Sequence, residues 1–161
     1  MAKIEAKLEK MGIVLPPPLK LPAGVVVPFE FVLVRGSTAY IAGHAAQNDD
    51  GTIAGPLGKV GAEVTPERAA ELARGVGISI LASLKRTLGD LDRIVGWNKA
   101  LGMVNVAPGF AATTGVINGF SNFIIEVFGP EAGAHTRSAV GVAVLPMNIA
   151  VEIEAEVEIR P

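Results

Sequence analysis

The last strand-like stretch of the chain alternates strictly between apolar and acidic residues. Its apolar positions are Val151, Ile153, Ala155, Val157 and Ile159, and a glutamate separates each from the next. Successive side chains of a strand point to opposite sides of a sheet, so this pattern predicts a strand with one buried face and one glutamate face. The segment from His135 to Pro146 predicts a second, apolar strand entered by Arg137, and we expect the two strands to form a pair.

Two earlier segments have the periodicity of helices. The first begins at Thr65-Pro66-Glu67, which combines an N-cap hydroxyl, a proline at the first helical position and an acid near the positive end of the helix dipole. Its apolar stripe consists of Leu72, Val76, Ile80, Leu84 and Leu88. The second predicted helix covers residues 112–128 and is closed by Gly129-Pro130.

The remaining regular elements are predicted strands. Residues 25–34 form an apolar run that Pro28 marks as an edge or a bulge. The turn Arg35-Gly36-Ser37 and the apolar residues 38–43 complete a hairpin, and residues 94–107 form another strand. The order of hairpin, helix, strand, helix and two strands predicts an α+β or α/β sandwich with both helices on one face of the sheet.

The chain length fits one domain, residues 1–161, in which residues 1–22 form a helical and proline-rich N-terminal arm. Residues 2–11 place Ile4, Leu8 and Met11 at helical spacing, and three prolines soon follow. A helix for a membrane or a partner is one interpretation. A helix lying on the rim of the domain is the favoured one, because the amphipathic pattern is weak.

Composition narrows the class of protein further. Half of the residues are hydrophobic and 19% are charged. This composition indicates a homo-oligomer in which neighbouring subunits cover the excess apolar surface. We find no apolar run of membrane-spanning length and no signal peptide, and we therefore expect a cytoplasmic protein. The net charge of −2 argues against a general grip on nucleic acid, and the absence of cysteine excludes thiolate chemistry.

Few residues offer catalytic chemistry. The chain has two histidines, His44 and His135, which do not have the spacing of a zinc site. The glutamates of the last strand are by default a solvated face, although one of them can face a site if an arginine compensates its charge. Arg137 is the candidate, since a guanidinium can hold a carboxylate with two hydrogen bonds. A structural salt bridge to a neighbouring subunit is the equal alternative.

Several motifs, taken in order, resemble those of the Rid proteins, the reactive intermediate deaminases, also called the YjgF family. No single motif is specific, but their order and spacing together are, and they cover most of the chain. The motifs are Tyr40-Ile41-Ala42-Gly43, Gly58-Lys59-Val60-Gly61, Leu88-Gly89-Asp90-Leu91, Val116-Ile117-Asn118-Gly119, Thr136-Arg137-Ser138 and Val151-Glu152-Ile153-Glu154-Ala155.

The resemblance implies a chorismate-mutase-like fold and a homotrimer whose sheets form a central barrel, with ligand clefts between subunits. In the best-known branch of the family, 2-imino acids and their enamine tautomers are hydrolysed to 2-keto acids and ammonium without a cofactor. Carried over by motif, Arg137 would clamp the carboxylate of a small metabolite and Glu152 would position the attacking water. Gly43 and Ala139 would contribute main-chain contacts, and Asn118 would line the cleft.

The chain departs from the deaminase pattern at three positions of the expected cleft. Ala42 stands in place of a serine, His44 in place of a glutamine, and Phe29 in place of a tyrosine. The loss of two hydroxyls leaves a second hypothesis open, a non-catalytic trimer that binds small carboxylic acids as a metabolite sensor. A ribonuclease, the third hypothesis, is disfavoured because the chain is acidic.

Overall fold

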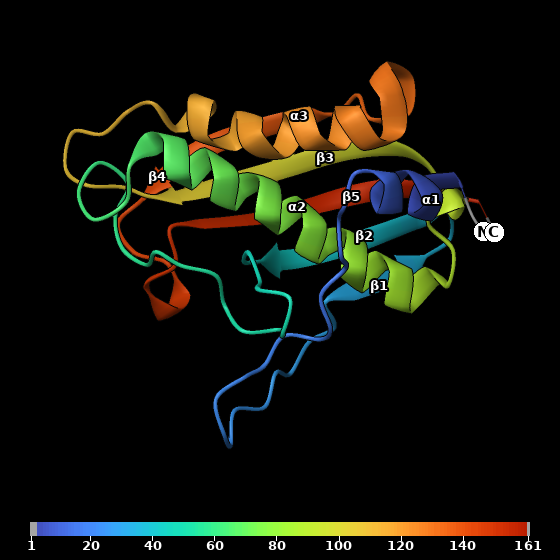
Figure 1. Cartoon of the computed structure of the whole chain (residues 1–161), viewed down its shortest axis with the longest axis horizontal. Helices are drawn as coiled ribbons and strands as arrows, with labels where there is room; N and C mark the ends of the chain where they lie inside the picture. The colour runs from blue at the N-terminus through green and yellow to red at the C-terminus, as the bar shows by residue number, and fades with distance from the viewer. Residues whose placement is uncertain (1–2, 161) are drawn as a thin grey trace.

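The computed structural model describes residues 3–160, and its centre is one mixed sheet of five strands in the order β1-β2-β5-β3-β4 (Figure 1). The strands are β1 (Val32–Arg35), β2 (Thr38–His44), β3 (Ile94–Asn105), β4 (Thr136–Val142) and β5 (Val151–Ile159). Every neighbouring pair is antiparallel except β3 and β4, which are parallel.

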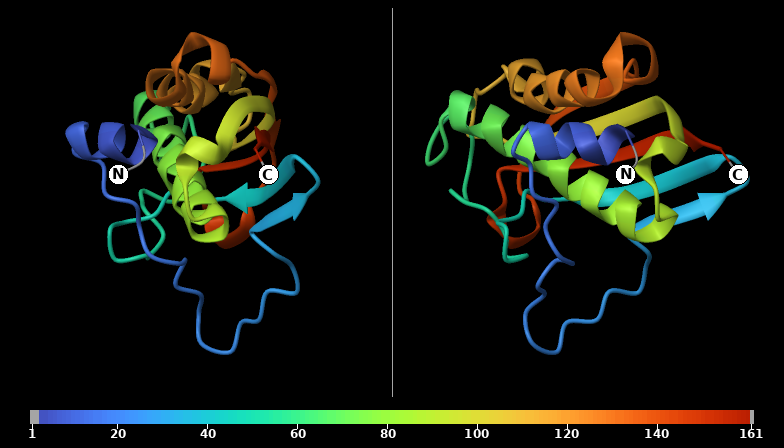
Figure 2. Two further views of the ribbon diagram at one scale, coloured as in Figure 1. Left: turned by 90° about the vertical axis from the view of Figure 1, so that its right-hand side faces the viewer. Right: turned by 45° about the vertical axis from the view of Figure 1, so that its right-hand side comes forward.

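Two long helices, α2 (Pro66–Leu88) and α3 (Thr113–Ala132), cover one face of this sheet (Figure 2). The Thr65 hydroxyl accepts a hydrogen bond from the Arg68 amide and so caps α2, and Gly89 ends the helix in a left-handed conformation. The predicted α+β class, with a mixed sheet and helices on one face, is therefore confirmed.

The two helices pack closely because glycine lies at their contact. A Cβ atom at Gly119 of α3 would lie 1.9 Å from the carbonyl oxygen of Ala70, and one at Gly77 of α2 would lie 2.7 Å from the ring of Phe123. Between the helices and the sheet lies the apolar core, which includes Phe120, Ile80 and the inward face of β5. Gly77 of α2 and Gly119 of α3 thus allow the two helices to approach each other closely.

The expected hairpin is present, but its first strand is much shorter than the sequence suggested. β1 begins at Val32, and residues 25–31 form no strand. Proline and the neighbouring turn remove ladder hydrogen bonds, and only the Phe31 carbonyl at the end of this segment accepts a sheet-like bond, from Ala42. The apolar residues 25–29 instead line a cavity.

The expected pairing of the last two strands is wrong. β4 pairs only with β3, at the edge of the sheet, whereas β5 lies between β2 and β3. The crossover through α3 returns β4 parallel to β3. A short 3-10 turn, Pro146–Asn148, then lets the chain cross to the other side of β3, where β5 finds antiparallel partners on both sides.

Helix α1 (Lys3–Lys10) lies at the rim of the domain, as the favoured interpretation predicted (Figure 2). The carboxylate of Asp92 accepts hydrogen bonds from the amides of Lys3 and Ile4, at 2.7 and 2.8 Å, and Leu8 is buried. Within residues 3–160, none of the helices has the length and apolar character that crossing a bilayer requires.

Candidate functional site

The side chain of Arg137 lies on the helix-covered face of β4, against α3. Its Nη1 atom donates to the Ser121 hydroxyl at 2.9 Å, and Nη2 donates to the carbonyl of Thr114 at 3.1 Å and to Oδ1 of Asn118 at 2.7 Å. Ala139, two residues further on the same face, has its carbonyl bonded by the Thr113 hydroxyl at 3.1 Å. The predicted residues Arg137, Asn118 and Ala139 therefore form one group.

His135 is linked to Arg137 through the hydroxyl of Ser121. Nδ1 of His135 lies 2.7 Å from the carbonyl oxygen of Gly133, which can only accept, so Nδ1 carries the hydrogen. In the neutral ring Nε2 accepts from the Ser121 hydroxyl at 2.9 Å, and Ser121 in turn accepts from Arg137. Burial lowers the pKa of Arg137 from its ordinary high value, and the guanidinium stays charged at neutral pH. His135 thus orients the guanidinium through Ser121.

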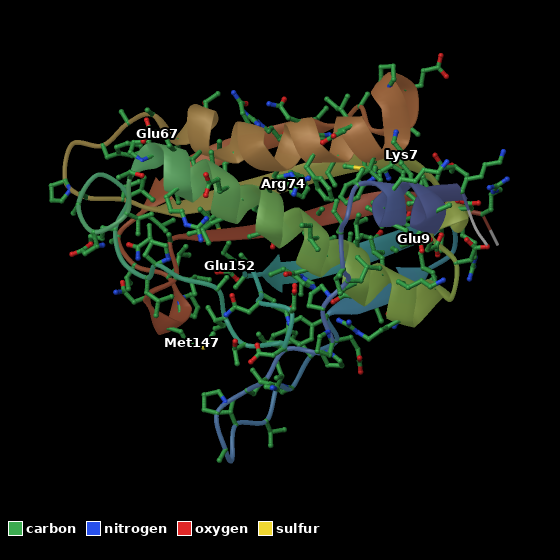
Figure 3. The ribbon with its side chains drawn as sticks, in the orientation of Figure 1. Lys7, Glu9, Glu67, Arg74, Met147 and Glu152 are labelled. Carbon is green, nitrogen blue, oxygen red and sulfur yellow. The ribbon has the colours of Figure 1, made fainter. Side chains whose placement is uncertain are left out.

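The second group of predicted residues is formed by Gly43, His44 and Glu152 (Glu152 is labelled in Figure 3). The ladder between β2 and β5 is irregular between Ile41 and His44. At this irregularity a Cβ atom on Gly43 would lie only 2.0 Å from Oε1 of Glu152. Burial raises the pKa of the half-buried Glu152 carboxyl, and the nearby charge of Glu154 raises it further.

His44 is held by a hydrogen-bond chain of the same kind as His135. Its Nδ1 donates to the carbonyl of Ala42 at 2.6 Å, and its Nε2 accepts from the Ser83 hydroxyl at 2.8 Å. Ser83 accepts from Arg86, which also donates to the carbonyl of Pro16 at 3.0 Å. Burial lowers the pKa of His44, and the charge of Arg86 lowers it further, so the ring is neutral at pH 7. Both ring nitrogens have hydrogen-bond partners, and the His44 side chain lines a cavity.

A cavity of about 490 Å³ opens beside Glu152, a size typical of small-molecule pockets. The lining is mainly apolar, and its polar residues are His44, Gln47, Ser83, Arg86, Thr87 and Glu152. The apolar lining includes Leu19, Leu21, Val25, Val26, Val27, Phe29, Phe31, Met147 and Ile149. Sequence reasoning missed this lining because the valine run has the composition of a strand.

Met147 reaches the rim of this cavity from a backbone conformation that side chains rarely adopt (Figure 3). Met147 and Asn148 both have a φ of 55°, which costs free energy in residues other than glycine. The buried Asn105 stabilises the turn, since its Nδ2 donates to Oδ1 of Asn148 and to the carbonyl of Ile149, both at 3.1 Å. Asn105 was not singled out from the sequence.

The two groups of residues lie on opposite faces of the sheet. Arg137 pairs with Ala100, which pairs with the buried Ala155, on the helix-covered face. Glu152 lies across from Met103, which pairs with Val140, on the open face. The expectation that a carboxylate of the last strand lies opposite Arg137 on a paired strand is therefore wrong within one chain.

One group of acids in the described residues has the proximity of metal ligands. Carboxylate oxygens of Glu5, Asp90 and Asp92 lie within 4.8 Å of one another. Each already accepts hydrogen bonds: Glu5 from Lys85 and the Leu91 amide, Asp90 from the Asp92 amide, and Asp92 from the first amides of α1. We therefore interpret these three acids as structural residues that hold α1 against the rest of the domain.

Comparison with known proteins supports the resemblance seen in the motifs. No family model matches the chain. Protein TCP17 of Trypanosoma cruzi is 35% identical over 160 residues, which cover 98% of this chain and 95% of that protein. A protein of unknown function from Agrobacterium tumefaciens is 37% identical and superposes with a TM-score of 0.84, covering 97% of this chain and 91% of its own.

A proposed endoribonuclease from Shewanella oneidensis is 25% identical, with a TM-score of 0.87 over 97% of this chain and 99% of that one. RidA of an Antarctic Psychrobacter superposes over 84% of this chain and 92% of its own, with a TM-score of 0.55 at 23% identity. The chain belongs to the Rid family. Within the family its fold is much nearer to the Agrobacterium and Shewanella proteins than to RidA, which agrees with a divergent branch.

Proposed function

We propose that the protein hydrolyses 2-imino acids and their enamine tautomers to 2-keto acids and ammonium, in clefts between the subunits of a homotrimer. The observation that carries the proposal is the separation of the two groups. Arg137 and Glu152 project from opposite faces of one sheet, so a site that uses both requires two copies of the chain. The activity and the trimer are those that the family resemblance implies.

The open face of the sheet supports this assembly. Leu33, Tyr40 and Val140 are 38%, 45% and 41% exposed on the same face as Glu152. Large apolar side chains gathered on one face indicate a surface that another subunit covers. A second copy docked there would bring its own Arg137 toward the Glu152 end of the cavity.

In this cleft the chemistry needs orientation and one base. The guanidinium of Arg137 binds the substrate carboxylate, and the Glu152 carboxylate accepts a proton from the attacking water. The hydroxide adds to C2 of the protonated imine, the C–N bond then breaks, and nitrogen leaves with the transferred protons as ammonium. The reaction includes no oxidation or reduction step. The raised pKa of Glu152 brings its basicity closer to the working pH.

The first experiment measures ammonium release from imino acids generated in situ by an amino-acid oxidase. Wild type should accelerate release, and Arg137→Lys should lose most of the acceleration, because lysine keeps the charge but not the two-pronged geometry. Glu152→Gln should lose it as well. If all three proteins matched buffer with several side chains, the deaminase would be rejected.

A complementation experiment tests the shared cleft. Inactive Arg137→Ala and Glu152→Gln chains, mixed equally and allowed to exchange subunits, should regain about a quarter of wild-type activity, because mixed trimers contain one intact cleft each. Each variant refolded alone is the control. A mixture as inactive as its components would contradict the intersubunit cleft, provided that mass spectrometry shows mixed trimers.

Binding without turnover is the second candidate, and one observation favours it: Ala42 and Phe29 supply no hydroxyl to the expected cleft. In that case 2-keto acids would bind in calorimetry, dependent on Arg137, while ammonium release stayed at the buffer rate. RNA cleavage is a third candidate, because the Shewanella neighbour is a proposed endoribonuclease. The net charge of −2 gives this third candidate little electrostatic support.

A further inference from the structure

The segment that joins α1 to β1 forms one wall of the cavity that Glu152 also lines. We call residues 18–31 the wall segment. Figures 1 and 2 show it extending beyond the sheet and the helices, between the end of the rim helix and the first strand. It supplies most of the apolar lining of the 490 Å³ cavity. We infer that this cavity receives a large apolar side chain of the substrate, branched aliphatic or aromatic, and this inference rests on the proposed function.

The wall segment is anchored at both ends. Before it, the carbonyl of Pro16 accepts from Arg86 at 3.0 Å and that of Pro17 accepts from Gln47 at 3.1 Å. Within it, the Lys20 amide donates to the Gly51 carbonyl at 3.0 Å, and at its end the Phe31 carbonyl accepts from the Ala42 amide at 3.0 Å. Hydrogen bonds to α2, to the loop at Gly51 and to β2 thus hold the wall in place.

The loop under the wall is shaped to receive it. Gly51 has a φ of +88°, and a Cβ atom there would lie 2.8 Å from the carbonyl oxygen of Pro18. Only glycine combines that conformation with that approach. The Arg86 that holds Pro16 also begins the hydrogen-bond chain to His44 at the cavity end. The side chain of Arg86 therefore helps to position both the wall segment and His44.

The distribution of polarity sets the class of ligand. Glu152 is the acid among the residues that line the cavity, and a protonated imine is complementary to its charge. The cation of the cavity, Arg86, already donates to Ser83 and Pro16. The wall segment contributes exposed valines to the lining, with Val25 51% and Val26 85% exposed. An imino acid held through its carboxylate by Arg137 of a second copy, with its imine carbon near Glu152, would extend its side chain along this apolar wall.

The volume decides between small and large side chains. A methyl group would leave most of the 490 Å³ unfilled, and an isobutyl or benzyl group would bury far more of the apolar lining. The imine of leucine has three more carbons than that of alanine. At the usual free energy for a buried methylene, kcat/KM should favour the leucine imine roughly 50-fold.

The test compares imines of alanine, leucine and phenylalanine with wild type and the variants Leu21→Asp and Val25→Asp. A carboxylate on the wall segment should reduce the preference for leucine over alanine, measured as the ratio of kcat/KM values, by about tenfold. Val14→Asp is the matched control, since Val14 is 62% exposed in the same arm but does not line this cavity. Circular dichroism and Tm verify that each variant is folded.

The outcomes separate the inference from the proposed function. Turnover of all three imines without a preference would overturn the inference and leave the deaminase standing. If no imine is turned over, calorimetry with the keto acids of leucine and alanine decides: tighter binding of the former, weakened by Val25→Asp, supports the cavity, and equal binding overturns it. If Val25→Asp instead dissociates the oligomer, the wall is a subunit interface and the inference is wrong.

Discussion

The backbone of Gly43 and the carboxylate of Glu152 approach so closely that any side chain at position 43 would displace the carboxylate. A Cβ atom would lie 2.0 Å from Oε1 of Glu152. The bulge between Ile41 and His44 brings the glycine to this position. The site of the proposed base is therefore built by two neighbouring strands, and position 43 controls where its carboxylate lies.

Gly43→Ala should displace the carboxylate without unfolding the protein. The clashing atom is the end of a flexible side chain, so we expect a stability loss under about 1 kcal/mol. Ammonium release should fall by at least about tenfold, because the base no longer meets the attacking water. The control is Gly96→Ala in β3, where a Cβ atom meets nothing within 4 Å. Equal effects of the two substitutions would contradict this account.

Ser121→Ala should loosen Arg137 without removing it. The guanidinium loses its bond to the hydroxyl and keeps Asn118 and the Thr114 carbonyl. We expect KM to rise roughly fivefold, the value of one hydrogen bond, with kcat little changed. Ser121→Thr should restore KM because it restores the hydroxyl. The control is Ser79→Ala, since Ser79 bonds only within α2. A fall in kcat alone would argue against a positioning role.

Acidification should destabilise the protein through His44. Its pKa is lowered in the folded state, so below about pH 6.5 the unfolded chain binds more protons than the folded one. The stability that neutral His44 contributes is complete above that pH and is lost as the pH falls through the lowered value. Urea unfolding at about pH 8 and about pH 5 measures the loss at fixed protein concentration. His44→Gln should show a smaller difference, and an unchanged difference would contradict the prediction.

Glu152→Gln should stabilise the folded protein at neutral pH while abolishing turnover. Burial, aided by Glu154, raises the pKa of Glu152. The folded protein favours the protonated carboxyl. The stability that this preference contributes is therefore complete below the ordinary pKa of Glu152 and is lost as the pH rises through the raised pKa. A neutral amide avoids that loss, and we expect a gain of about 0.5 kcal/mol in the free energy of unfolding. Glu158→Gln, on an exposed position of the same strand, is the control.

Two glycines of α3 should respond in opposite ways. Gly119→Ala places a methyl group 1.9 Å from the backbone oxygen of Ala70 and forces the helices apart, so we expect a loss of about 3 kcal/mol. Gly115→Ala meets nothing within 4 Å in the same helix and should gain up to about 1 kcal/mol. Chemical unfolding at one protein concentration measures both. Similar losses for the two variants would contradict the packing described for α2 and α3.

Local pattern predicted most of the elements. The alternation of β5 gave its buried and its glutamate face, and the capping residue Thr65 marked the start of α2. These features depend on neighbours in the sequence, since side-chain alternation and helix caps are local. The family motifs led to the residues Arg137, Asn118, Gly43 and Glu152, which the structure gathers into two groups.

The tertiary structure alone decided how those residues are related. The pattern of a strand shows which of its faces is buried, but it does not determine which other strand forms hydrogen bonds with it. Only the fold shows that β5 lies between β2 and β3 with β4 at the edge, which puts Arg137 and Glu152 on opposite faces. Likewise the valines at 25–27 have the composition of a strand. They line a cavity instead, because proline cannot donate a ladder hydrogen bond and because Arg86 and Gln47 fix the preceding chain through hydrogen bonds to its carbonyl groups.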